Sequence, residues 1–205
     1  MLTFMGFQVL AFLVYILSLT AIIPLVIHGS YRYRMSRTSW RGIRFGYRGD
    51  KKELYGIFIK GLLLTLVTFG IYGSWFVISI RNYVLSHIRI GNGKFRYSGD
   101  GTDFFVLNLV GYLLTLVTLG IYGFWWQKNL FEYYVNHLTI ENGEERIYFK
   151  SIATGGGFFS LLVVNLLMVI FTFGLATPWV IVRTLRFVFD NIELQGDLDL
   201  NKLVQ

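Results

Sequence analysis

One stretch of this sequence occurs nearly unchanged in two places. The eleven residues from Thr65 to Trp75 recur fifty positions later, from Thr115 to Trp125, with two changes. A third and more diverged copy, Thr172 to Trp179, lies 54 positions further on. Repeats at this spacing indicate one supersecondary unit used several times. The fold must therefore be one that three similar units can build together.

Each unit has the pattern of two helices joined by a tight aromatic turn. An apolar segment of about 17 residues precedes a Gly-Ile-Tyr-Gly-x-Trp element, and a second apolar segment follows it. Glycine interrupts helices, whereas tyrosine and tryptophan prefer a bilayer interface. We therefore expect three helical hairpins with their tips at the outer face of a membrane. The expected helices are Leu54 to Ile71, Trp75 to Ile88, Phe104 to Ile121, Trp125 to Leu138, Phe158 to Leu175 and Trp179 to Asp190.

The apolar content of the chain also favours a membrane protein. Hydrophobic residues make up 54% and charged residues 15%, whereas an average soluble domain is about 25% charged. The segment from Phe4 to Ile27 is almost wholly apolar and predicts a retained transmembrane helix. The alternative, a cleaved signal peptide, normally has a basic start and a shorter apolar core. The basic residues that follow, which the positive-inside rule places in the cytoplasm, are Arg32, Arg34, Arg37, Arg41, Arg44, Arg48, Lys51 and Lys52.

Short alternating patterns between the hairpins predict β-strands. Asn92-Gly93 is a strong hairpin turn, which would pair Ile90 with Phe95 and Arg89 with Arg96. Because like charges that face each other destabilise a sheet, Arg89, Lys94 and Arg96 are the predicted surface for lipid headgroups or a protein partner. Open sheet edges cannot lie in lipid, so we expect one small cytoplasmic sheet. The other strand patterns are Ile43 to Tyr47, Leu138 to Phe149, Ile192 to Leu194 and Leu198 to Leu200.

The predicted fold is thus membrane α-helical, with an N-terminal transmembrane helix and three transmembrane hairpins that alternate with short β-hairpins. This gives about seven spans, with the N-terminus outside and the C-terminus in the cytoplasm. The short hairpin helices leave partial re-entry open as an alternative. The predicted units are an N-terminal helix (1–30), a basic segment with a strand (31–53) and three repeats (54–99, 100–150 and 151–205).

These elements resemble those of a known family. Thr-x-Gly-Ile-Tyr-x-x-Trp hairpins at Thr68 to Trp75 and Thr118 to Trp125, followed by the strand from Lys94 to Gly99, look like the bacterial YjgN-like inner-membrane proteins. The resemblance covers roughly residues 40 to 195. That family usually has proline just before the tryptophan, which only Pro178 keeps here. The resemblance implies a bacterial inner (cytoplasmic) membrane location and supplies no catalytic residue.

A polar stripe runs along the second helix of every unit. Ser79, Asn82, Tyr83 and Ser86 align with the same positions of the later copies, at the spacing of one helical face. If the units pack around a threefold axis, the stripes converge on a polar path or on a site for an anion or lipid headgroup. The candidate residues are Asn82, Asn129, Glu132, Asn136, Arg183, Arg186 and Asp190.

Plainer interpretations of these residues stay open. The stripe approaches a helix end, where polar side chains are ordinary and long cations reach the interface. Glu132 could pair with Arg183 or Arg186 across repeats, or with Lys128 one turn away. His87 and His137 occupy equivalent positions at helix ends and are weak metal candidates without an obvious third ligand.

The sequence indicates no enzyme and no cofactor. It has no cysteine, and it lacks the common hydrolase, metalloprotease and nucleotide-binding motifs. The net charge of +7 has no nucleic-acid recognition motif beside it. Two functions are therefore expected: a transporter or channel-like protein with a polar path between repeats, or a non-transporting scaffold. The scaffold would bind a protein partner through the basic sheet, and either protein could form homo-oligomers.

Overall fold

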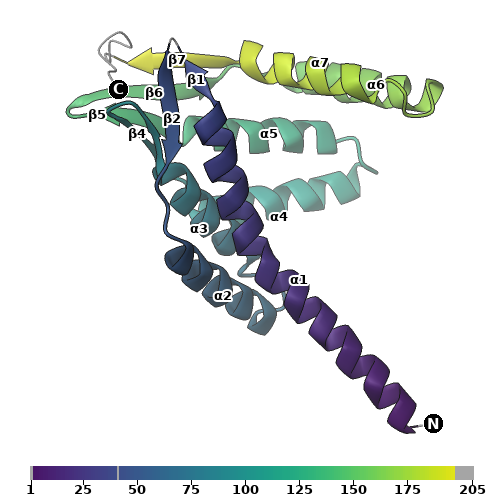
Figure 1. Cartoon of the computed structure of the whole chain (residues 1–205). Coiled ribbons are helices and arrows are strands. Elements are labelled where there is room, and N and C mark those ends of the chain that lie inside the picture. Colours follow the sequence, from purple (N-terminus) through teal and green to yellow (C-terminus); the bar gives the residue numbers. More distant parts are fainter. Residues whose placement is uncertain (1, 41, 197–205) are drawn as a thin grey trace.

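The computed structural model describes residues 2–40 and 42–196 (Figure 1). Helix α1 (Leu2–Arg37) is followed by strands β1 (Ser39–Trp40) and β2 (Ile43–Tyr47). The same order of elements then repeats, two helices followed by strands. These elements are α2 (Lys51–Val67), α3 (Gly73–Ser86), β3 (Ile88–Ile90), β4 (Gly93–Tyr97), α4 (Gly101–Val117), α5 (Gly123–Asn136), β5 (Leu138–Asn142), β6 (Glu145–Ser151), α6 (Gly155–Phe171), α7 (Thr177–Asp190) and β7 (Ile192–Gly196).

The described strands join in a single antiparallel sheet in the order β1 to β7, so strands that follow one another in the chain are neighbours. A helical hairpin is inserted between β2 and β3, between β4 and β5, and between β6 and β7. Because these strands alternate in direction, all three hairpins leave from the same end of the sheet and return to it (Figure 1). The sheet therefore forms a base from which the hairpins project.

Side-chain caps fix where the first helix of each hairpin begins. The carboxylate of Asp50 accepts hydrogen bonds from the backbone N–H groups of Lys52 and Glu53, and Asp100 does the same one repeat later. In the third repeat the hydroxyl of Thr154 accepts from Gly157 at 3.1 Å. Such caps satisfy N–H groups that have no partner within the helix. A cap thus fixes the residue at which each hairpin begins, shortly after the preceding strand.

The helices form a row rather than a closed bundle. Each of α2 to α7 packs mainly against its neighbours along the chain, and α1 lies against α2 and β2. Burial concentrates at the sheet end, where Leu54 is fully buried and Phe104 is 6% exposed. On one face of the sheet, Ile90, Ile140 and Ile147 form a core cluster. The well-packed part of the molecule is therefore the sheet and the hairpin bases.

The prediction of a membrane α-helical fold with about seven spans is wrong. Among residues 2–40 and 42–196, no helix combines the length and the apolar character that crossing a bilayer requires. The hairpin helices have 17 or 14 residues, which is about 25 or 21 Å and less than the roughly 20 residues of a typical span. The predicted multi-pass inner-membrane location, with its assigned sides for the termini, is wrong for the same reason.

The predicted register of the first β-hairpin is also wrong. Arg89 pairs with Lys94, and Ile90 pairs with Gly93, so Gly91-Asn92 forms the turn instead of Asn92-Gly93. Gly91 has a φ of +55°, which glycine adopts at little cost at the first turn position. A shift by two residues leaves every side chain on its expected face. The pattern Leu198 to Leu200 lies outside the described residues.

Candidate functional site

The hairpin tips share an unusual backbone feature. Phe69, Leu119 and Phe173 have φ values of +50°, +50° and +49° and are the described non-glycine residues with positive φ. This left-handed conformation normally suits glycine or asparagine and is strained for bulky side chains. All three side chains are also almost fully exposed, at 97%, 94% and 97%. Every tip therefore exposes a large apolar side chain at a position whose left-handed backbone conformation favours a small or polar residue.

The backbone of each tip satisfies its own hydrogen bonds. The hydroxyl of Thr68 donates to the carbonyl of Leu64 at 2.7 Å and accepts from the N–H of Tyr72 at 3.0 Å. The N–H of Gly70 donates to the carbonyl of Thr65 at 2.7 Å. The other two tips repeat this arrangement around Thr118 and Thr172. The turn thus closes without help from water for these groups.

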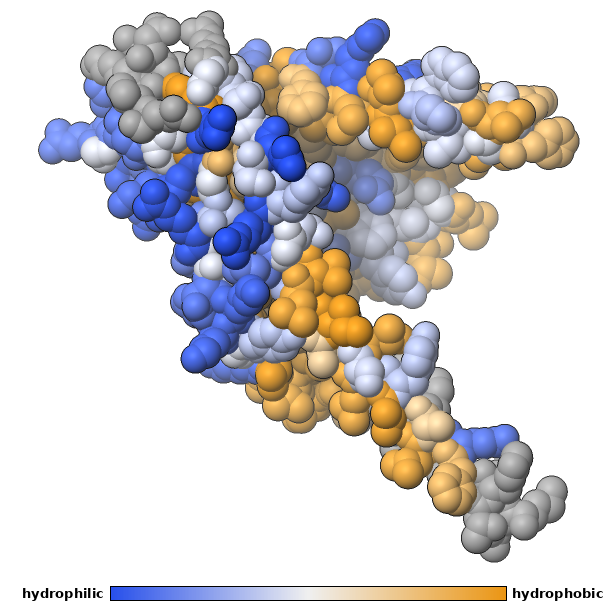
Figure 2. Space-filling model, in the orientation of Figure 1, coloured by the Kyte–Doolittle hydropathy of each residue, from blue (hydrophilic) through white to orange (hydrophobic). Residues whose placement is uncertain are grey.

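Exposed apolar side chains surround the tips. Four equivalent positions in each repeat are more than half exposed, and Figure 2 shows apolar surface on the ends of α6 and α7 away from the sheet, with hydrophilic surface over the sheet. Large apolar side chains that gather on a protein surface commonly mark a place where a protein, a ligand or a membrane binds. The twelve residues are Leu66, Val67, Phe69, Ile71, Leu116, Val117, Leu119, Ile121, Ile170, Phe171, Phe173 and Leu175.

The predicted polar stripes lie in separate hollows, each within one hairpin. Ser79 and Asn82 line a hollow of about 480 Å³ with Lys60 in the first hairpin. Asn129 lines the equivalent hollow of about 360 Å³ in the second hairpin with Asp103. Arg183, Arg186 and Asp190 line a hollow of about 290 Å³ in the third. None of these hollows has residues from two repeats, so the stripes do not meet around a common axis.

Two further stripe residues have local partners. The ammonium of Lys128 binds the carboxylate of Glu132 within helix α5, so Glu132 pairs with Lys128 rather than with either arginine of the third repeat. The side-chain oxygen of Asn136 accepts a hydrogen bond from the N–H of Ser151 at 2.8 Å. Asn136 thereby ties α5 to strand β6. Both residues have contacts that explain their presence without a ligand.

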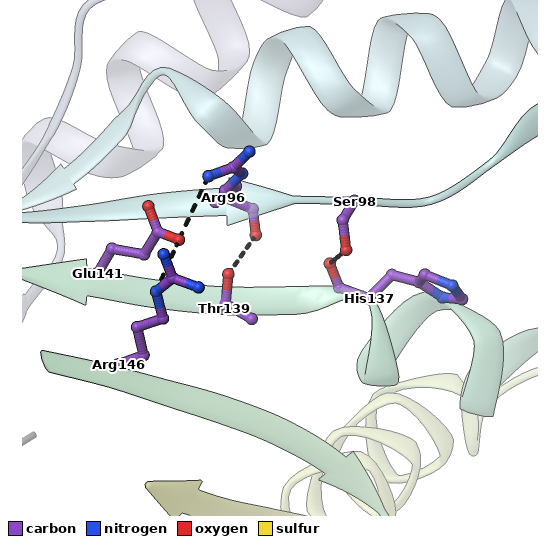
Figure 3. A network of polar contacts seen from close by, with 6 residues as sticks. All are labelled: Arg96, Ser98, His137, Thr139, Glu141 and Arg146. Carbon is purple, nitrogen blue, oxygen red and sulfur yellow. Dashed lines mark hydrogen bonds and ion pairs between the residues drawn. The ribbon is translucent and has the colours of Figure 1, made fainter. Parts of the chain in front are cut away.

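The predicted basic surface lies on the sheet face opposite the core cluster. Lys94 and Arg96 are exposed there, whereas Arg89 is half-buried and donates to the carbonyl of Ser86 at 3.0 Å. Glu141 lies between Arg96 and Arg146, at 3.5 and 3.4 Å (Figure 3). In β2 to β7 this outer face carries six basic side chains and two acidic ones. They are Arg44, Arg89, Lys94, Arg96, Arg146 and Lys150, and Glu141 and Glu193.

The two histidines bind the ends of their own helices. Nδ1 of His87 lies 2.7 Å from the carbonyl oxygen of Tyr83, and His137 repeats this contact with Tyr133. Among the residues that the structure describes, no three potential ligands gather where they could hold a metal ion. The histidine rings lie 4.3 Å from the tyrosine rings of the same turn. Their position fits a helix-end contact.

Sequence reasoning missed Arg81 and the tip residues. The guanidinium of Arg81 lies over the rings of Tyr97 and Tyr134, at 5.3 and 4.0 Å from their centres. Burial raises the pKa of the Tyr97 phenol well above its usual range, and the nearby Arg81 opposes that rise in part. The tip residues could have been found from the repeat, because Phe69, Leu119 and Phe173 align directly before a glycine. A left-handed residue commonly ends a helix at that place.

Comparisons with known proteins identify a family and no characterised relative. No curated protein and no solved structure matches the chain. The family described as "Bacterial protein of unknown function (DUF898)" matches residues 1–105, 92–142 and 125–205. These matches together run through the whole chain and overlap at the repeats. The chain therefore belongs to this family of bacterial proteins of unknown function.

Proposed function

We propose that this protein is a non-catalytic scaffold whose three helical hairpins dip into a lipid bilayer from one side. The tips lie in the hydrocarbon, and the sheet stays at the water-facing surface. Each hairpin enters and returns at the same end of the sheet, so the arrangement needs no helix that crosses the bilayer. A helix of 17 residues, about 25 Å long, reaches hydrocarbon without emerging beyond a core of about 30 Å.

The observation that carries this proposal is the exposed apolar residue at positive φ in all three tips. In water such a residue has two free-energy costs: the backbone is strained, and a large apolar side chain stays hydrated. In lipid the second cost becomes a gain of about 1.5–3 kcal/mol for each buried side chain. Exposed side chains such as Phe69, Leu119 and Phe173 are therefore expected where a protein inserts into the hydrocarbon of a bilayer.

The closed hydrogen bonding of the tips supports the same occupant. Unpaired backbone groups are costly in hydrocarbon, so buried turns must satisfy them internally. The threonine hydroxyls and the glycine N–H groups at the tips do so. A protein partner would need a separate apolar pocket for each of the three tip side chains. Lipid tails, in contrast, adapt to any distance between the tips.

A combined variant with Phe69→Asn, Leu119→Asn and Phe173→Asn tests the proposal. Asparagine tolerates positive φ, so folding should be preserved while apolar contact is lost. In flotation with phosphatidylcholine vesicles, we expect the variant to bind more than about a hundredfold more weakly. A matched variant with Tyr148→Asn, Ile152→Asn and Leu194→Asn, all exposed near the sheet, should bind like the wild type. Unchanged binding of the tip variant would contradict the proposal.

A second function is favoured by the excess of basic side chains on the outer face of the sheet. With the hairpins in lipid, Lys94 and Arg96 would face water and could bind an acidic protein. Fluorescence anisotropy with poly-glutamate as the probe should show binding that weakens with salt. Replacing Lys94 and Arg96 by glutamine should weaken that binding several-fold. If this variant binds poly-glutamate as tightly as the wild type, the proposed binding of an acidic protein is wrong. Transport is less well supported, because the polar stripes lie in separate hollows.

We also infer that the chain is a YjgN-like member of its family. The support is the Thr-x-Gly-Ile-Tyr-x-x-Trp element, which occurs twice, and Pro178, which precedes Trp179 in the third repeat. Each element forms a hairpin turn of the same geometry.

A further inference from the structure

We propose that the third hairpin binds one anionic lipid, with the lipid phosphate at Arg183 and Arg186 and an acyl chain along the apolar hollow beside them. This inference rests on the proposed entry of the hairpins into lipid. It assigns to the third repeat a selectivity that the other two repeats lack.

Two hollows share the pair of arginines. One, of about 530 Å³, is lined by the arginines and by apolar groups, and it lies toward the tip. The other is the hollow of about 290 Å³ at the base of the hairpin, which adds polar groups. A phospholipid has the same division into a charged head and an apolar tail. The residues that line the first hollow beside the arginines are Met168, Pro178, Trp179 and Val182.

The charge of the third hairpin is concentrated at this place. Helix α6 has no ionisable side chain, and α7 has Arg183, Arg186 and Asp190. Asp190 lines the basal hollow with the arginines and partly offsets their charge, but it does not line the apolar one. No ion pair to either arginine exists within the described ranges 2–40 and 42–196. Both guanidinium groups are therefore available to an external anion.

The position of Arg183 favours an anion beside it in lipid. It lies in the middle of α7 (Thr177–Asp190), about 9 Å from the helix start at 1.5 Å per residue. Cations at such depth pair with an anion or extend toward the headgroups. Arginine suits a phosphate because its planar group can donate two parallel hydrogen bonds. Arg186 lies one turn nearer the sheet on the same helical face, so the pair can hold one phosphate from two sides.

The equivalent positions in the other repeats do not offer this site. Ser79 and Asn82 replace the arginines in the first hairpin, and Asn129 and Glu132 replace them in the second. Neither pair carries two positive charges, and the second pair includes a carboxylate. The hollows of the three hairpins therefore differ in the charge of the side chains that line them.

The test compares binding to vesicles of phosphatidylcholine alone with vesicles that contain one-fifth phosphatidylglycerol. We expect the wild type to bind the mixed vesicles about tenfold more tightly, and native mass spectrometry to retain one phosphatidylglycerol per chain. The double variant Arg183→Gln, Arg186→Gln should lose both signals and still bind pure phosphatidylcholine. The matched variant Arg34→Gln, Arg37→Gln removes two exposed arginines at the same spacing on α1 and should behave like the wild type.

Each outcome decides between the two proposals. If the double variant keeps the preference for phosphatidylglycerol, or if the α1 variant loses it equally, the lipid site is refuted while hairpin insertion stands. Native mass spectrometry that retains glycerol phosphate and no phosphatidylglycerol when both are present would overturn the lipid form in favour of a small-anion site. If the wild type binds neither kind of vesicle, hairpin insertion itself fails, and this inference fails with it.

Discussion

The first two hairpins have a hydrogen bond between their two helices at the base, and the third hairpin lacks it. The phenol of Tyr83 donates to the carbonyl of Asp50 at 2.8 Å, and Tyr133 makes the same contact with Asp100. In the third hairpin Phe187 occupies the equivalent position and has no hydroxyl to donate. A hydrogen bond thus joins the second helix to the start of the first in the first two copies, whereas in the third the ring of Phe187 packs against that of Phe158.

The helices of the first two hairpins also approach more closely than those of the third. A Cβ atom on Gly61 would lie 2.0 Å from the ring of Phe76, and one on Gly111 would lie 2.3 Å from the ring of Trp126. The third repeat has Asn165 in place of the glycine, and its amide donates to the hydroxyl of Thr184 at 3.1 Å. Helix α7 contains no buried residue.

The difference suggests that the copies divide two roles. In the first two copies the helices of the hairpin pack closely, because a glycine on the first helix contacts an aromatic ring of the second. The third keeps the tip geometry, has Asn165 and Phe187 in place of the glycine and the tyrosine, and carries two arginines at positions where the other copies have no basic side chain. Variants that remove or transfer these features measure how far the copies have diverged.

The largest effect is expected from the close helix contact of the second hairpin. Gly111→Ala would place its Cβ against Trp126, and such overpacking costs about 1–3 kcal/mol of unfolding free energy. Gly56→Ala is the control, because nothing lies within 4 Å of that site and alanine is the better helix former by about 1 kcal/mol. Thermal unfolding followed by circular dichroism should give opposite signs. Equal shifts would show that the contact is not tight.

The next effect concerns the tyrosine at the hairpin base. Tyr133→Phe removes the donor to the carbonyl of Asp100 and should lower the free energy of unfolding by about 1–2 kcal/mol. The reciprocal change, Phe187→Tyr, adds a hydroxyl near the Thr154 cap and should stabilise the third hairpin by up to about 1 kcal/mol. Urea denaturation measures both. A destabilised Phe187→Tyr protein would mean that the third base has a different geometry.

A smaller effect should appear as a dependence on pH. Backbone N–H groups of Glu53 and Lys52 hold the pKa of Asp50 below its usual value, and those of Asp103 and Thr102 do so for Asp100. Carboxylates with depressed pKa stabilise the fold above the unfolded pKa of about 3.9, and that stability is lost as the pH falls through the folded pKa. The protection of backbone amides against hydrogen exchange, relative to the intrinsic rate at each pH, should therefore fall in acid at the starts of α2 and α4 but not at the Thr154 cap of α6. An equal fall at all three starts would contradict this assignment.

The smallest effect is expected on the outer face of the sheet. Arg96→Ala removes one of two cations that contact Glu141 at about 3.5 Å. Its side chain is 62% exposed, and exposed ion pairs contribute about 0–1 kcal/mol. Because Arg146 still contacts Glu141, thermal unfolding should change little. A loss comparable to that of Tyr133→Phe would show that the network has a structural role.

The repeat made the hairpins and strands predictable, because three copies of one pattern reinforce one another. The alternation at Ile43 to Tyr47 and the apolar segments around the Gly-Ile-Tyr-Gly element became β2 and the hairpin helices. The predicted crossing of the bilayer by the hairpins was wrong because the glycine turns limit each hairpin helix to 17 residues or fewer. Composition reports apolar content, but it does not report how the chain divides that content between helices.

The candidate site was predictable only in part. The polar stripes do lie on one side of each second helix, since i, i+3 and i+4 spacing defines a helical face. Their separation into three hollows depends on the order of packing in the row of helices, which no local pattern encodes. The hairpin tips were predicted, but Phe69, Leu119 and Phe173 were not singled out, because a sequence shows neither the φ nor the exposure of a residue. These residues become informative only when their φ and their exposure are known together.

The central claim, that the tips enter lipid from one side, is most directly tested by depth measurements with spin labels. The chain has no cysteine, so single cysteines can replace Phe69, Leu119, Phe173 and, as a reference, Lys94. In phosphatidylcholine vesicles we predict that the three tip labels become accessible to oxygen and shielded from a water-soluble nickel reagent, while the label at Lys94 stays open to nickel. Tip labels that remain as accessible to nickel with vesicles as without them would contradict the account.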